Sequence, residues 1–142
     1  MSSEPQVVLD TSAAVPLLVS SHEAHAMVSS WAVGRVLGLS GHALAETYAV
    51  LTRLPGDSRV SPADAVRLID DNFQYRLVLD SEVAGDAHRE LARCGVSGGA
   101  TYDGLVALTA RAHDAVLVTR DARARPTYEA VGAQVQVLVD TR

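Results

Sequence analysis

The sequence predicts a three-layer α/β/α domain around a parallel five-stranded sheet. Short runs of β-branched residues alternate with longer helical patterns, an order typical of parallel strands joined by right-handed crossover helices. The chain has 142 residues, 48% apolar and 20% charged, which is enough to bury a core without disulfides. The sequence contains no repeat, low-complexity tract or linker, so we expect a single domain over residues 1–142.

The first part of the chain contains two expected strands and three expected helices. Val7–Leu9 is a strand because it is a short, wholly apolar and mostly β-branched run. Helical patterns then cover Ser12–Val19 and Glu23–Val33, and Val36–Leu39 is a weaker second strand. His42–Arg53 is the next helix, because its pattern closes at a Leu-Pro-Gly-Asp turn.

The middle of the chain has a clear helix start. Ser61 suits the N-cap and Pro62 suits the first helical position, because each residue type is favoured there. This helix is expected to run to about Phe73. Tyr75–Leu79 follows as the third strand.

The last part repeats the alternation of helix and strand. Glu82–Arg93 is expected to be helical, Gly95–Gly99 is a loop, and Thr101–His113 is a second helix. Ala115–Val118 and Val135–Val139 are the fourth and fifth strands.

Composition excludes several classes of function. All 12 basic residues are Arg, so the chain has no P-loop lysine, no Schiff-base lysine and no Ser–Lys dyad. A net charge of -5 argues against general binding of polyanions, and nucleic acid would need a local patch or bound cations. Aromatic residues are only 4%, so a platform that stacks several bases is not expected.

The single cysteine and the short apolar runs are typical of a protein of the cytoplasm. Cys94 alone cannot form a disulfide framework or a zinc site of several cysteines. The longest apolar stretch, Ala13–Val19, contains a proline and is too short to cross a bilayer. We therefore expect a cytoplasmic protein without a membrane anchor.

Acidic residues follow four of the five expected strands. Asp10 and Asp121 come after the first and fourth strands, and Asp80 and Asp140 come after the third and fifth. Ligands of an open parallel sheet bind beyond the carboxyl ends of its strands. However, Asp after a strand is also common as a turn or capping residue. A functional role therefore requires that several acids converge.

Two further acids lie on predicted helices. Glu46 belongs to a helix that is apolar around most of its circumference, so its carboxylate needs a cation, a metal or water, or an ion pair with His42 or Arg53. Asp103 lies in the first turn of its helix, where an acid also complements the helix dipole. If Asp10, Glu46, Asp103 and Asp121 meet, their repulsion requires cations, and hard oxygen ligands suit Mg²⁺ or Mn²⁺. Such a site favours hydrolysis of phosphodiester bonds by metal-activated water.

The segments that contain these acids resemble the four acidic motifs of PIN domains. The segments are Val8–Ala13, His42–Glu46, Tyr102–Ala110 and Leu117–Asp121. Their order and spacing match over nearly the whole chain, and Thr52–Pro55 resembles the VapC branch of toxins. The resemblance implies sheet order 3-2-1-4-5, a Mg²⁺- or Mn²⁺-dependent endoribonuclease, a homodimer, and inhibition by a small VapB-type antitoxin.

The resemblance also implies roles for single residues. Asp10 and Asp103 would bind the metal directly, Asp121 would bind a second ion or act through water, and Glu46 would hold or orient water. The RNA products would carry 5′-phosphate and 3′-hydroxyl ends. Thr11, Thr119 and Arg120 are the candidate substrate-binding residues, since an arginine grips phosphate in a bidentate manner.

Two other functions fit parts of the pattern. An α/β phosphohydrolase would use Asp10 as the nucleophile, but that class needs a downstream Lys, and the chain has none. A non-catalytic binding module with a PIN-like shell is the second alternative. A ligand that binds the native state raises its stability, so unchanged thermal stability on addition of Mn²⁺ would favour this module.

Overall fold

Five parallel strands form the central sheet of the computed structural model, which describes residues 6–139. They are β1 (Val7–Leu9), β2 (Leu37–Ser40), β3 (Tyr75–Leu77), β4 (Val116–Thr119) and β5 (Gln134–Val137). The order across the sheet is β3-β2-β1-β4-β5, and every neighbouring pair is parallel. The predicted fold class and strand order are therefore confirmed.

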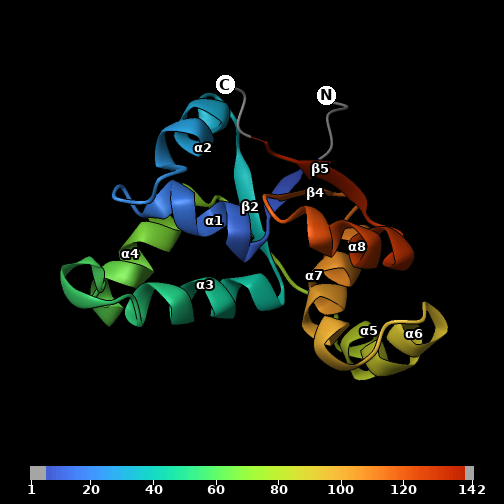
Figure 1. Cartoon of the computed structure of the whole chain (residues 1–142). Helices are drawn as coiled ribbons and strands as arrows, with labels where there is room; N and C mark the ends of the chain where they lie inside the picture. The colour runs from blue at the N-terminus through green and yellow to red at the C-terminus, as the bar shows by residue number, and fades with distance from the viewer. Residues whose placement is uncertain (1–5, 140–142) are drawn as a thin grey trace.

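Helices cover both faces of this sheet, which completes the three layers (Figure 1). The α-helices are α1 (Thr11–Leu18), α2 (His25–Ala32), α3 (His42–Thr52), α4 (Pro62–Asn72), α5 (Ser81–Gly85), α6 (Ala87–Arg93), α7 (Thr101–Ala112) and α8 (Arg125–Val131). Short 3₁₀ turns occupy Gly56–Ser58, Gly98–Ala100 and Ala122–Ala124. Within the described residues, none of these helices combines the length and the apolar character that a membrane span requires.

Two differences from the sequence prediction concern helices. The helix expected over residues 82–93 is two helices, because the backbone of Asp86 (φ -108°, ψ 8°) leaves the helical region between α5 and α6. The neighbouring Gly85 favours such a break, since glycine is a poor helix former. The second difference is α8, which the pattern does not predict. Its Pro126 lies in the first turn, where proline is tolerated instead of breaking the helix.

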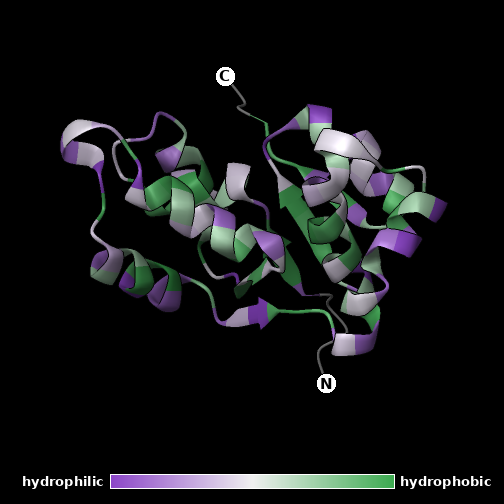
Figure 2. Cartoon of the chain, turned by 90° about the horizontal axis from the view of Figure 1, so that it is seen from below, coloured by the Kyte–Doolittle hydropathy of each residue, from purple (hydrophilic) through white to green (hydrophobic). Residues whose placement is uncertain are grey.

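The core has one apolar cluster on each face of the sheet. Alternate strand residues point to opposite faces, so Val8 and Leu117 pack against α6, α7 and α8, whereas Leu9 and Val118 pack against α1, α2 and α4. Figure 2 shows the hydrophobic residues gathered on the strands and on the helix surfaces turned toward them. Burial on both faces explains why the two central strands β1 and β4 read as nearly continuous apolar runs, whereas the edge strand β5 alternates Gln with Val.

Gly41 connects β2 to α3 in a conformation that favours glycine. Its backbone has φ 54° and ψ -122°, and its N–H donates to the carbonyl of Leu77 at 2.7 Å. A Cβ at this position would lie 2.6 Å from Oγ1 of Thr109 on α7. The absence of a side chain therefore allows α3 to start close beside α7, and these two helices carry Glu46 and Asp103.

We expect Gly41→Ala to lower the free energy of unfolding by about 2–4 kcal/mol, from the positive φ and the clash with Thr109 together. Gly34→Ala is the matched control, because Gly34 also has a positive φ (75°) but open space around its Cα. This control should lose only about 1–2 kcal/mol. Urea unfolding of both variants measures the difference, and equal losses would show that α3 and α7 do not require the close approach.

Candidate active site

Four carboxylates from four different elements line one cavity of about 160 Å³ at the carboxyl edge of the sheet. Asp10 follows β1 and Asp121 follows β4, and these strands are neighbours in parallel register. Asp103 comes from the first turn of α7, and Glu46 from the second turn of α3. The structure thus brings together the four acids that the sequence singled out.

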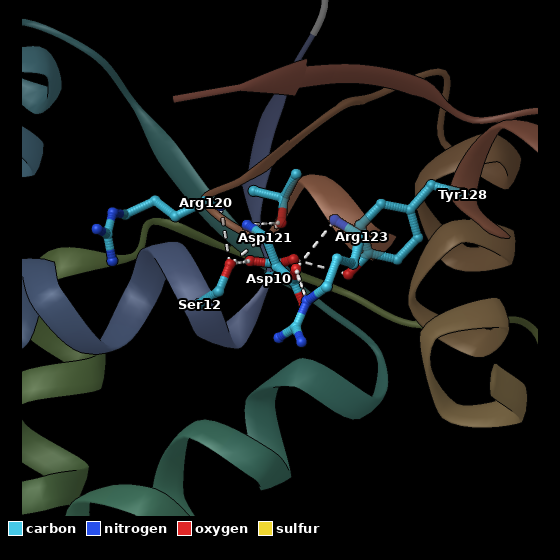
Figure 3. A network of polar contacts seen from close by, with 7 residues as sticks. Asp10, Ser12, Arg120, Asp121, Arg123 and Tyr128 are labelled. Atoms are coloured by element: carbon cyan, nitrogen blue, oxygen red, sulfur yellow. Dashed lines mark hydrogen bonds and ion pairs between the residues drawn. The ribbon is translucent and has the colours of Figure 1, made fainter. Parts of the chain in front are cut away.

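Asp10 is the most buried of the acids, with 5% of its surface exposed. Its Oδ1 accepts hydrogen bonds from Oγ of Ser12 at 2.6 Å and from the backbone N of Ala13 at 3.2 Å. Its Oδ2 accepts one hydrogen bond, from the hydroxyl of Tyr128 at 2.7 Å. Figure 3 shows Ser12 and Tyr128 directed at this carboxylate. Because each carboxylate oxygen has two lone-pair directions, Oδ2 keeps one of them for a further ligand.

Tyr128 is a site residue that the sequence analysis missed. It lies on α8 with 1% of its surface exposed, and burial together with Asp10 raises the pKa of its hydroxyl well above the usual range. The hydroxyl therefore remains a donor to Asp10 at any physiological pH. A signal was present in the sequence, since Ala124, Tyr128 and Val131 have the spacing of a buried helix face.

Ser12 and Thr119 connect α1 to the segment after β4. Their hydroxyls lie 3.1 Å apart, Oγ of Ser12 accepts from the backbone N of Arg120 at 2.9 Å, and Oγ1 of Thr119 accepts from the backbone N of Asp121 at 3.0 Å. Ser12 therefore does more than start a helix, because it also holds the loop that carries Asp121.

The candidate substrate-binding residues have different positions. Thr11 lines the cavity, and its hydroxyl donates to Oε2 of Glu46 at 3.1 Å. Thr119 has none of its surface exposed, because its side chain turns inward to Ser12. The guanidinium of Arg120 does not line the cavity, and Figure 3 shows it directed away from Asp10. The expected contact of Thr119 and Arg120 with substrate therefore does not agree with this geometry.

The remaining acids have only weak partners. Among the described residues Glu46 forms no ion pair with His42 or Arg53, and Thr11 is its hydrogen-bond donor. Asp121 accepts from the backbone N and from Nε of Arg123, at 3.0 and 3.3 Å. The side chain of Arg123 is 94% exposed, so this ion pair contributes little stability. The negative charge of the cavity is therefore largely uncompensated by the protein.

The pKa of Asp103 is raised at this site. Burial raises the pKa of its carboxyl, and the charges of Asp10, Glu46 and Asp121 raise it further, while His42 lowers it. Burial and like charges both disfavour the ionised form. Placing the four ionised carboxylates around one cavity consequently destabilises the fold in the absence of a cation.

The oxygen-only donor set fits a hard divalent cation. Within residues 6–139, however, no group of three or more Asp, Glu, His or Cys side chains is arranged to hold a metal ion on its own. Mg²⁺ commonly takes one or two carboxylates and keeps several waters. Coordination by two of these carboxylates with water in the other positions therefore agrees with the geometry.

Asp80, the acid that follows β3, does not take part in the cavity. Asp80 is the N-cap of α5, where its Oδ1 accepts from the backbone N of Val83 at 2.9 Å. This is the turn or capping role that is common for Asp after a strand. Asp140 lies outside the described residues.

Comparison with known proteins gives matches over most of the chain. The family model for the PIN domain matches residues 7–129. Ribonuclease VapC27 of Mycobacterium tuberculosis is 52% identical over 134 residues, which cover 94% of this chain and 98% of that protein. Ribonuclease VapC40 of the same species is 42% identical over 130 residues, which cover 91% and 96%.

Solved structures show the same fold at low sequence identity. The structure of FitAB bound to an IR36 DNA fragment matches with a TM-score of 0.65 and 22% identity, covering 93% of this chain and 94% of that one. VapBC2 from Rickettsia felis, bound to a DNA fragment from its promoter, matches with a TM-score of 0.64 and 16% identity, covering 94% and 98%.

The raised pKa of Asp103 leads to a prediction about stability. The folded chain binds the proton of this carboxyl more tightly than the unfolded chain does, so protonation of Asp103 stabilises the fold. This contribution to stability is fully present below the pKa of the unfolded chain and is lost as the pH rises through the pKa of the folded chain. In EDTA, Asp103→Asn should therefore unfold at a higher temperature than the wild type at pH 7. The gain should shrink at pH 4.

Thermal unfolding followed by circular dichroism measures this difference. Asp71→Asn is the control, because Asp71 is an exposed carboxyl on α4 that does not line the cavity. A melting temperature of Asp103→Asn at or below that of the wild type at pH 7 would contradict the proposed repulsion.

Proposed function

Because this chain belongs to the PIN domain family, we propose that it is a metal-dependent endoribonuclease that acts as the toxin of a VapBC-type toxin–antitoxin pair. The observation that carries the proposal is the cavity in which Asp10, Glu46, Asp103 and Asp121 meet. The two relatives named VapC ribonucleases support the same conclusion at 52% and 42% identity over nearly the full length of both chains.

We assign the ion to Asp10 and Asp103. Asp10 offers the free direction on Oδ2, and Asp103 faces the same cavity without a hydrogen bond or ion pair among the described residues to occupy its oxygens. Bound Mg²⁺ or Mn²⁺ would supply an activated water and offset the charge that develops on the phosphoryl group. The specific metal is part of this proposal.

The protein's own side chains then position the reactants. Glu46 accepts from Thr11 through Oε2, which orients its carboxylate so that Oε1 remains available to hold the attacking water. Asp121 also lines the cavity and is held by its backbone contacts, and it binds a second ion or acts through water. Attack on the phosphorus would then leave a 5′-phosphate and a 3′-hydroxyl end.

The structure gives a reason to prefer hydrolysis over attack by Asp10 itself. Three hydrogen bonds, from Ser12, Ala13 and Tyr128, stabilise the charge of this carboxylate and hold it fixed. A carboxylate stabilised in this way is a weak nucleophile, whereas a fixed orientation suits a metal ligand. The absence of Lys from the sequence further disfavours a phospho-aspartate intermediate.

We further propose that the chain works in the cytoplasm with partners of the family type. The substrate is RNA, a VapB-type antitoxin inhibits the enzyme, and two copies form a homodimer. Structural neighbours named as FitAB and VapBC2 complexes support the antitoxin partner. An antitoxin that presents a cation to the cavity would satisfy the carboxylates in place of a metal.

The first test is Asp10→Asn. This substitution should lower the rate of RNA cleavage by about 100-fold or more, since a direct ligand is worth at least as much as the residues that orient it. It should also abolish growth arrest on expression. Asp80→Asn, which changes a capping acid outside the cavity, should retain cleavage.

Purified enzyme and mapped ends across total RNA measure both effects, and EDTA should stop cleavage until Mg²⁺ or Mn²⁺ is restored. Full cleavage by a clean Asp10→Asn preparation, or by the wild type in EDTA, would refute the mechanism.

The second test is Tyr128→Phe. Loss of the hydroxyl leaves Oδ2 of Asp10 without its donor, and removal of a group that orients a metal ligand typically weakens metal affinity about 10- to 100-fold. Titration with Mn²⁺ followed by isothermal calorimetry measures the affinity directly. Tyr75→Phe on β3, outside the cavity, is the matched control and should bind Mn²⁺ as the wild type does.

A further inference from the structure

We propose that Tyr102, supported by His42, is a stacking platform for one RNA base beside the scissile phosphate. The inference rests on the proposed ribonuclease function and adds a substrate-binding subsite to it. Tyr102 is the residue before Asp103, and His42 lies one helical turn before Glu46. The two aromatic rings do not line the acidic cavity themselves, but their contact joins α3 and α7, the helices that provide two of its carboxylates.

The geometry of the pair is that of a preformed stack. The ring centroids are 4.7 Å apart, and the planes are inclined by 22°. Tyr102 nevertheless has 56% of its surface exposed. Because His42 contacts the ring and the residue is still more than half exposed, much of the remaining surface of Tyr102 is open to solvent. Bases of single-stranded RNA bind to such open aromatic faces because every base has a π-face.

Electrostatic attraction alone would give this site a low affinity for RNA. The chain carries a net charge of -5, and four carboxylates line the cavity. The arginines nearest to Asp121 are already engaged, since Arg123 pairs with Asp121 and Arg125 pairs with Glu129. The guanidinium of Arg120 points away from the cavity. Base stacking on an aromatic ring would add binding free energy that does not depend on positive charge.

The low aromatic content limits the platform to a single base. Tyr48 and Tyr102 are the only tyrosines of the described residues among the exposed large apolar side chains. Tyr48 lines a different cavity, between α3 and α4. Tyr102 is thus the exposed aromatic ring at the carboxylate site, and Tyr48 provides a control on the same type of residue.

The experiment measures RNA binding in the full-length chain with Asp10→Asn present, so that the probe is not cut. The probe is a short fluorescein-labelled oligouridylate, titrated by fluorescence anisotropy at several salt concentrations. Tyr102→Ala should weaken binding about 5- to 100-fold. Tyr102→Phe should stay within about two-fold of the parent because the ring is retained, and Tyr48→Ala should do the same because it lies outside the site.

The salt dependence separates stacking from charge. Tyr102→Ala should shift all affinities without changing the slope of log affinity against log salt, because the ring carries no charge. An oligonucleotide that carries 2-aminopurine should lose fluorescence on binding to the parent and to the Tyr102→Phe variant, and should keep it with Tyr102→Ala.

Two results would overturn the proposal. One is unchanged affinity and quenching in Tyr102→Ala, and the other is an equal loss in Tyr102→Ala and Tyr102→Phe, which would assign the effect to the hydroxyl. Cleavage of RNA by the otherwise wild-type chain is measured in parallel. If cleavage persists while Tyr102→Ala binds normally, only the platform fails; if the wild type neither binds nor cuts RNA, the proposed function fails as well.

Discussion

Repulsion among four carboxylates is the constraint on which the proposed active site depends. Asp10, Glu46, Asp103 and Asp121 come together at the carboxyl edge of β1 and β4, and the pKa of Asp103 is raised by burial and further by the charges of the other three acids. This repulsion lowers the stability of the folded chain, which is a common cost where function requires like charges in one place. The field is also what attracts a cation, so the same arrangement that destabilises the fold favours the metal on which catalysis is proposed to depend.

The surroundings keep the repelling groups in place without neutralising them. Asp10 is fixed by Ser12, Ala13 and Tyr128, which are hydrogen-bond donors and carry no charge. Glu46 is oriented by the hydroxyl of Thr11 in the same manner. Neutral donors preserve the negative charge, whereas buried arginines would have cancelled it. The only ion pair at the cavity within the described residues, Asp121 with Arg123, involves an almost fully exposed guanidinium and is therefore weak.

An acidic protein that acts on RNA must bind a polyanion against its own net charge. The cation proposed at Asp10 and Asp103 would reverse the field locally, and the aromatic pair of Tyr102 and His42 offers an interaction that does not depend on charge. Asp103 and the aromatic pair belong to α3 and α7, two helices that Gly41 allows to approach closely. The backbone conformation of one residue thus affects the position of Glu46 and of the surface against which RNA is proposed to stack.

The sequence by itself determined the alternation of strands and helices and the acids at the strand ends, because these depend on local patterns and on the rule that parallel strands end at one edge. Ser61 and Asp80 are also correct as capping residues, since a cap forms with neighbours in sequence. Only the tertiary structure decided that Tyr128 supports Asp10, 118 residues away. It also decided that Thr119 is buried against Ser12 and that the guanidinium of Arg120 points away from Asp10. Side-chain direction depends on which groups the packing of distant segments brings within hydrogen-bond reach, and no local pattern in the sequence encodes that.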